Sequence, residues 1–113
     1  MFVALHAPKH LSSQSKRLYR QLAVDYELGR EPHALEVLRL ALEAVDRCAQ
    51  ARDVLALNGG PFIADRFGVP KAHPAVAVER DARLAALRAF RELALDGEEP
   101  EPRPPRRGSG ALT

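Results

Sequence analysis

The sequence of 113 residues is poor in the residues that build β cores and covalent cross-links. It has no Trp, aromatic residues make up only 5%, and Ile63 is the only isoleucine. Sandwiches and barrels need runs of β-branched and aromatic residues, so these shortages argue against an all-β fold. A single cysteine, Cys48, excludes an internal disulfide and is typical of a reducing compartment.

Long apolar runs and sorting signals are also missing. No run approaches the roughly 20 apolar residues that are needed to span a bilayer. The apolar start, residues 1–5, is too short for a secretory signal and lacks a basic region before it. We therefore expect a soluble, intracellular protein.

No constellation of residues points to catalysis. The histidines have no metal-ligand spacing, and one cysteine cannot complete a zinc site. The segment 58–61 lacks the lysine and the spacing of a phosphate-binding loop. We predict that the protein is not an enzyme and has no catalytic residues, no metal site and no cofactor.

The sequence does contain three helical patterns. The first helix begins at Ser12 or Ser13, either of which can cap it, and runs to about residue 28, with Gly29 in the left-handed position after it. The second is opened by Pro32 and runs to about residue 57, and the third is opened by Pro74 and runs to about residue 94.

The segment between the last two helices, residues 60–73, breaks the helical period. It predicts a very short hairpin around residues 65–68, with Gly68 at a positive φ. We expect its two Phe side chains to fill part of a core.

The long second helix has more apolar surface than one small domain readily covers. Two adjacent apolar stripes span an arc of about 220°, whereas a surface helix needs little more than about 100°. We predict that part of this arc packs against other copies of the chain. The alternative is a compact three-helix bundle without a partner. The interface candidates are Leu35, Leu38, Leu42, Val45, Val37, Leu40, Ala44 and Arg52.

The third helix carries an Ala-rich stripe that would allow a close approach to a neighbouring helix. The stripe consists of Val78, Ala82, Ala85, Ala89 and Leu93.

Positive charge is concentrated at the N-terminus. The net charge is only +2, but residues 1–24 contain Lys9, Lys16, Arg17 and Arg20 and no acidic residue. The helical period places the last three on a face away from the leucines and tyrosines of the first helix. These four residues are the candidates for DNA binding through phosphates. The alternative is a merely solvated face.

The chain is thus predicted to be mainly α: a three-helix unit with a long central helix, a short hairpin-like loop before the last helix and a disordered C-terminal tail. The divisions are an N-terminal arm, 1–11, a helical oligomerisation and DNA-binding domain, 12–95, and a Pro/Arg-rich tail, 96–113. The composition of the tail is typical of disorder.

Several segments resemble the short, all-helical class of phage terminase small subunits. They extend over residues 10–96, and the most distinctive is Asp65-Arg66-Phe67-Gly68 followed by Pro70-Lys71 and His73-Pro74-Ala75. The other segments are His10-Leu11-Ser12, Leu28-Gly29, Pro32-His33-Ala34-Leu35, Leu42-Glu43-Ala44, Asp46-Arg47, Glu79, Asp81-Ala82-Arg83 and Leu93-Ala94-Leu95.

The resemblance implies a ring-like homo-oligomer of a genome-packaging motor, working in the cytoplasm of the host cell. Such a protein binds double-stranded viral DNA and presents it to the terminase large subunit, which holds the ATPase and nuclease. The residues leave two other hypotheses open, a small helical DNA-binding regulator and a non-catalytic protein–protein scaffold.

Overall fold

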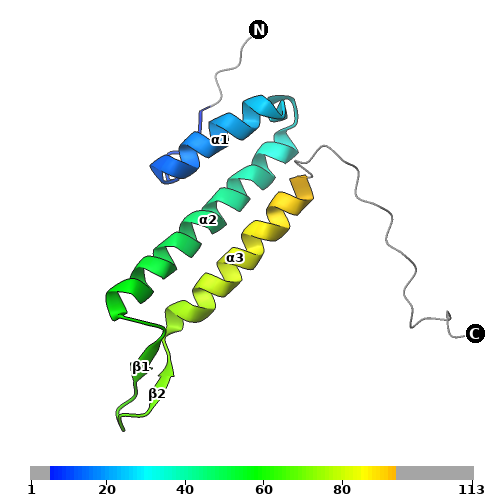
Figure 1. Ribbon diagram of the computed structural model, residues 1–113. Coiled ribbons are helices and arrows are strands. Elements are labelled where there is room, and N and C mark those ends of the chain that lie inside the picture. The colour runs from blue at the N-terminus through cyan, green and yellow to red at the C-terminus, as the bar shows by residue number, and fades with distance from the viewer. Residues whose placement is uncertain (1–5, 94–113) are drawn as a thin grey trace, which may run out of the picture.

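A computed structural model of the protein describes residues 6–93 (Figure 1). Its elements are α1 (Ser13–Asp25), a 3-10 turn η1 (Leu28–Arg30), α2 (Pro32–Asn58), β1 (Phe62–Ala64), β2 (Pro70–Ala72) and α3 (Pro74–Leu93). The predicted fold, mainly α with a long central helix and a short hairpin before the last helix, is confirmed. The predicted tail and the first five residues of the arm lie outside the described residues.

Two helices form the axis of the molecule. α2 and α3 lie side by side and antiparallel, and α1 lies against the N-terminal half of α2 (Figure 1). The β1–β2 hairpin projects beyond the end at which α2 finishes and α3 starts (Figure 1). One end of the helix pair is therefore three helices thick, and the other end carries only the hairpin.

α1 begins as predicted but ends early. Ser12 is the N-cap, and its hydroxyl accepts a hydrogen bond from the backbone N–H of Ser15 at 3.2 Å. The helix ends at Asp25, and the left-handed residue is Glu27, with φ of 54°, whereas Gly29 lies in η1. The expectation for Gly29 was wrong because the chain reverses earlier, which places Leu28 in the core with 7% of its surface exposed.

The main core lies at the three-helix end. Leu38 and Leu42 of α2 are fully buried there. The surrounding buried residues come from the arm, α1, η1 and α2, and they are Leu11, Tyr19, Ala23, Leu28 and Ala34. Phe90 and Leu93, at the end of α3, pack against them. In this half of α2 the chain itself covers the part of the apolar arc that contains Leu38, Ala41 and Leu42, whereas Leu40 stays 53% exposed.

Small residues hold α2 and α3 close together. On α2, Ala34, Ala41 and Cys48 are buried and recur every seven residues, which is the spacing of a coiled-coil seam. On α3 the buried residues are Ala75, Ala82 and Ala86.

The predicted Ala-rich stripe of α3 was therefore correct at Ala82, whereas Val78 and Ala85 are exposed. The buried face lies about 40° around the helix from the predicted one. Ala75 and Ala86, which the prediction omitted, complete the contact.

The hairpin is fastened at both ends by side chains. The Asn58 amide donates to the carbonyls of Gly60 and Phe62, at 2.7 and 3.0 Å. The Asp65 carboxylate accepts from the backbone N–H groups of Phe67 and Val69, at 2.8 and 2.9 Å. The hairpin was predicted, and so was the positive φ of Gly68, which is 78°.

The expectation that the two Phe side chains fill a core was wrong. Phe62 is 65% exposed and Phe67 is 77% exposed. The hairpin consists of two three-residue strands that extend past the helices, so none of the helices within residues 6–93 forms a second layer against it (Figure 1).

Candidate nucleic-acid interface

α1 presents its positive charges to solvent. Its buried side consists of Ser15, Tyr19 and Ala23. At 100° per residue, Arg17 falls on the opposite side and Arg20 falls about 100° from the centre of the buried side, and both are exposed.

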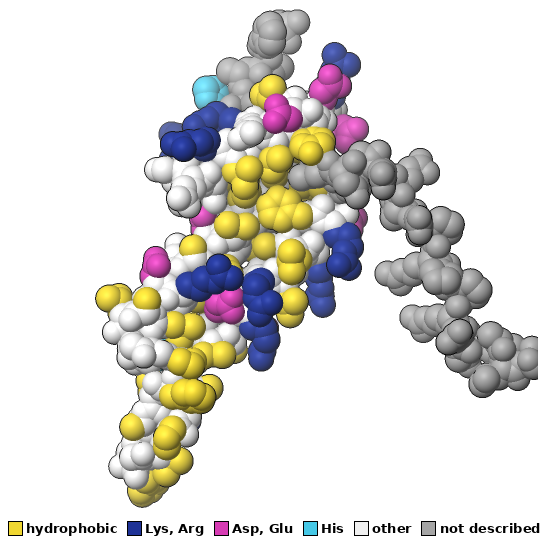
Figure 2. Space-filling model, in the orientation of Figure 1, with side chains coloured by type: hydrophobic (Ala, Val, Ile, Leu, Met, Phe, Trp, Pro, Cys, Tyr) yellow, Lys and Arg dark blue, Asp and Glu magenta, His cyan; other side chains and the backbone are white. Residues whose placement is uncertain are grey.

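The other two predicted cations flank this side. Lys16 is half-buried at its edge, and Lys9 is exposed on the segment that leads into the helix. We call Lys9, Lys16, Arg17 and Arg20 the basic face, and Figure 2 shows Lys and Arg side chains gathered over this part of the molecule.

Within residues 6–93 the four cations of the basic face form no salt bridge. By contrast, Arg39 binds Glu36 and Glu43 at 2.6 and 2.9 Å. Arg52 and Arg83 both bind Glu79, at 3.3 and 3.2 Å. A cation beside a carboxylate contributes little to the outer field, so the basic face is the part of α1 suited to an external anion.

The position of these cations does not serve folding. Lys16 and Arg17 stand in the first two turns of α1, close to the positive end of the helix dipole. The first turn contains no acidic residue that would offset them. Cations at this end of a helix are mildly destabilising, so helix stability does not account for them.

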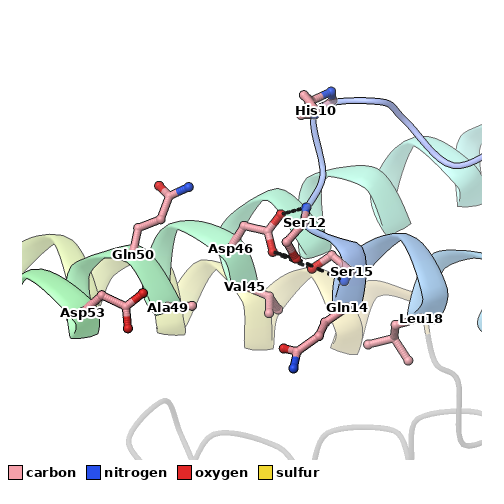
Figure 3. Close-up of a pocket in the computed structure, with 10 residues that line it drawn as sticks. All are labelled: His10, Ser12, Gln14, Ser15, Leu18, Val45, Asp46, Ala49, Gln50 and Asp53. Carbon is pink, nitrogen blue, oxygen red and sulfur yellow. Dashed lines mark hydrogen bonds between the residues drawn. The ribbon is translucent and has the colours of Figure 1, made fainter.

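A carboxylate of α2 anchors the start of α1. Asp46 accepts hydrogen bonds from the backbone N–H and the hydroxyl of Ser12, at 2.8 and 2.7 Å, and from the hydroxyl of Ser15 at 2.6 Å (Figure 3). Burial acts to raise the pKa of Asp46, but these bonds outweigh it and hold the pKa below its ordinary value. The anchor fixes how the basic face sits on the rest of the molecule.

The arm is tied to α2 a little further along. The His10 ring nitrogen Nε2 lies 2.8 Å from a Glu43 carboxylate oxygen. Glu43 also accepts from Arg39, which bridges to Glu36. Together with the burial of Leu11, this chain of contacts keeps Lys9 close to α1.

We expect Asp46→Ala to lower the free energy of unfolding by about 1–3 kcal/mol at pH 7, because the buried Ser15 hydroxyl loses its acceptor. The folded-state pKa is depressed, so this contribution is present above the ordinary Asp pKa of about 3.9 and is lost as the pH falls through the folded value. Urea unfolding at pH 7 and at pH 3 measures both effects.

The matched control for this prediction is Asp25→Ala. Asp25 is the last residue of α1, is exposed and has no salt bridge within residues 6–93. It should cost less than about 0.5 kcal/mol. If Asp46→Ala lowered the free energy of unfolding by the same amount at pH 7 and at pH 3, the anchor role of the Asp46 carboxylate would be contradicted.

Two residues that the sequence interpretation missed lie beside the basic face. Gln14 and Gln21 are exposed and flank Arg17 on the same side of α1. Glutamine and arginine side chains bind base edges in the major groove. The spacing of three and four residues around Arg17 is a signal that the sequence already carries.

The predicted interface residues are distributed over three environments. Leu38 and Leu42 are fully buried inside the chain, so they belong to its core and present no surface to a neighbour. Leu40 is 53% exposed. Leu35, Val37, Ala44 and Val45 are half-buried.

Arg52, the last interface candidate, is 62% exposed and pairs with Glu79 of the same chain. Burial acts to raise the pKa of Glu79, but the bonds from Arg83 and Arg52 outweigh it and lower that pKa. This glutamate is therefore charged, and it joins α2 to α3.

The largest exposed apolar side chains lie at the other end of the molecule. Leu57 is 90% exposed, and beside it the hairpin exposes Phe62, Phe67 and Val69. Figure 2 shows hydrophobic side chains running down this end. Periodicity alone does not predict this exposure, because the face of a hairpin is buried only if another layer covers it.

Comparisons with known proteins are negative. No protein-family model, curated protein or solved structure matches the chain. The site is therefore interpreted from its own residues.

Three further features concern metal sites, the single cysteine and the length of the helices. Residues 6–93 contain no group of three or more His, Cys, Asp or Glu side chains placed to hold a metal ion. Burial raises the pKa of the Cys48 thiol, and a protonated thiol is a poor nucleophile. Among the described helices, none is both long and apolar enough to cross a membrane.

Proposed function

We propose that the chain is the small terminase subunit of a phage genome-packaging motor. It binds viral DNA as a ring-like homo-oligomer and presents that DNA to the large subunit, which supplies the ATPase and nuclease chemistry. The single observation that carries the proposal is the basic face on and before α1, whose four cations form no salt bridge within residues 6–93. The resemblance of residues 10–96 to short terminase small subunits supports it.

In this proposal α1 makes two kinds of contact with DNA. The basic face binds phosphates, which gives affinity and orientation but no sequence preference. Gln14, Arg17 and Gln21 provide side chains that are able to read base edges if α1 enters the major groove. The anchor at Asp46 keeps the helix rigid, so little order has to be created on binding.

Charge reversal on α1 tests the function. We expect Lys16→Glu with Arg20→Glu to weaken binding to duplex DNA by about 10- to 100-fold at moderate salt. Each lost phosphate contact should reduce the log–log salt slope by about 0.9, so the double variant should lose nearly 2. Fluorescence anisotropy over a series of salt concentrations measures both quantities.

The matched control makes the same change of net charge on another helix. Arg88→Glu with Arg91→Glu reverses two exposed cations of α3 that have no salt bridge within residues 6–93. Its DNA affinity should fall by less than about threefold. If both double variants lost the same amount of DNA affinity, the effect would be due to net charge alone. If the affinity of the α1 variant were unchanged, α1 would not be part of the DNA site.

A non-catalytic scaffold is the second candidate, and the exposed apolar hairpin favours it. The same titration separates the two functions. Assembly without salt-dependent DNA binding would identify a scaffold, whereas a DNA-binding monomer or dimer would identify a small regulator.

A further inference from the structure

The tip of the hairpin carries an exposed aromatic side chain, Phe67, with the positive charge of Arg66 beside it, and we call these two residues the knob. Phe67 is 77% exposed, and the Arg66 guanidinium lies 5.1 Å from the centre of its ring. The Asp65 carboxylate holds the turn through two backbone N–H groups. A turn that is already fixed loses little entropy on binding, and tryptophan, tyrosine, phenylalanine and arginine are the residues enriched at protein interfaces.

A hollow elsewhere on the molecule has the complementary chemistry. It measures about 400 Å³ and lies where the start of α1 meets the middle of α2 (Figure 3). Leu18, Val45 and Ala49 give it apolar walls, and Asp46 and Asp53 are its acidic residues. Asp46 is occupied by Ser12 and Ser15, whereas Asp53 forms no salt bridge within residues 6–93. Asp53 is thus the carboxylate available to an incoming cation.

The knob does not reach the hollow of its own chain. From Ala49, in the hollow, α2 continues for nine residues to Asn58, which corresponds to about 14 Å. The hairpin then carries the tip further in the same direction (Figure 1). A knob that enters this hollow therefore belongs to another molecule.

We propose that the Arg66-Phe67 tip of one copy docks in the hollow of a second copy. Phe67 packs on Leu18, Val45 and Ala49, and Arg66 pairs with Asp53. This inference rests on the proposed function and names the contact that joins its subunits. The two surfaces differ, so each copy gives one knob and receives one, and such head-to-tail contacts close into a ring when the rotation allows it.

The area available agrees with a contact centred on this end of the molecule. With about 150–250 Å² per aromatic side chain, the exposed parts of Phe62 and Phe67 amount to roughly 300 Å². A stable interface buries about 800 Å² on each partner. Val69, next to the knob in the turn, and Leu57, in the last turn of α2, extend the exposed apolar area at this end of the molecule toward that size.

Removing the knob is the first test. Phe67→Ser in the full chain should raise the dissociation constant of assembly by about 30-fold or more, the factor of an interface hot spot. Light scattering on a sizing column would then show the protomer, 12.4 kDa, at concentrations where the parent is assembled. The control is Val24→Ser, which removes an apolar side chain of α1 that is 65% exposed. An unchanged mass for Phe67→Ser, or a parent that is monomeric throughout, would overturn the proposal.

A charge exchange tests the pairing of Arg66 with Asp53. Arg66→Glu and Asp53→Arg should each weaken assembly by about tenfold, and the two together should restore it to within about threefold of the parent. Both residues are exposed, so folding should be unaffected. Single variants that weaken assembly without mutual rescue would rule out this pair.

A mixing experiment tests the head-to-tail geometry. Ala49→Arg places a bulky cation in the hollow and leaves the knob intact, whereas Phe67→Ser leaves the hollow intact. Each variant alone should be monomeric, and an equimolar mixture should give one 1:1 pair and nothing larger. Absence of that pair would contradict a contact between two different surfaces.

These outcomes are separable from a failure of the proposed function. Phe67→Ser keeps the whole basic face, so its protomer should still bind duplex DNA and lose that binding when Lys16 and Arg20 are reversed. Loss of assembly with DNA binding retained supports the docking contact, and intact assembly without DNA binding would overturn only the function.

Discussion

Leu42→Asp should unfold the protein. Leu42 has no exposed surface, and it packs in the core where α1, α2 and α3 meet. The change leaves a cavity and buries a carboxyl group without a partner, which together cost about 4 kcal/mol or more. A domain of this size has only about 5–15 kcal/mol of total stability. Circular dichroism during heating should show no cooperative transition, or one lowered by more than about 15 °C.

The matched control is Leu40→Asp. Leu40 is two residues away on the same helix, but it is 53% exposed. Its aspartate would stay hydrated, so the melting temperature should fall by no more than about 4 °C. Equal effects of the two substitutions would mean that the N-terminal half of α2 is not buried in the way described.

The second large effect is expected from Ala82→Phe. Ala82 is 5% exposed in the seam between α2 and α3, and no space exists there for a ring unless the helices separate. Overpacking of a core typically costs about 1–3 kcal/mol, and a seam of small residues should be at the upper end. Urea denaturation should show a lower midpoint with little change in slope.

Ala85→Phe is the control, and it also separates two descriptions of α3. The sequence pattern placed Ala82 and Ala85 on one buried stripe, whereas Ala85 is exposed in the structure. Its substitution should therefore cost only the loss of helix propensity, about 0.5 kcal/mol. If Ala85→Phe were as damaging as Ala82→Phe, the seam would have the orientation predicted from the sequence.

The elements that local chemistry determines were predicted well. Ser12 caps α1 and Pro32 opens α2, each for a reason that acts within a few residues. Gly68 likewise marks the hairpin turn. Capping, a fixed proline φ and a left-handed glycine depend on the chain nearby, so one sequence was sufficient for them.

The predictions that were wrong concern features that depend on tertiary packing. Leu28 is buried and Phe67 is exposed, although the sequence suggests a helix end at the first and a core residue at the second. Neither outcome follows from periodicity, because each depends on which element lies opposite in space. The apolar arc on α2 is shared between α1, α3 and the surface, and periodicity does not reveal that division.

In the candidate site, too, the features set by local helical spacing could be predicted and those set by tertiary contacts could not. The outward position of Arg17 and Arg20 followed from helical spacing, and so would that of Gln14 and Gln21 had the polar residues been weighed with the charged ones. The role of Asp46 did not follow, since its partners Ser12 and Ser15 lie more than thirty residues away in sequence.

The uneven thickness of the core has a consequence for local unfolding. The large buried side chains of α2 lie in its first half, whereas the second half is buried only through Cys48 and Ala51. Little apolar area then opposes opening of the distal turns, which should exchange their amide hydrogens far faster than those around Leu38. The hydrogen-exchange protection of these last turns of α2 should rise toward that of the turns around Leu38 only when another molecule covers this end of the helix.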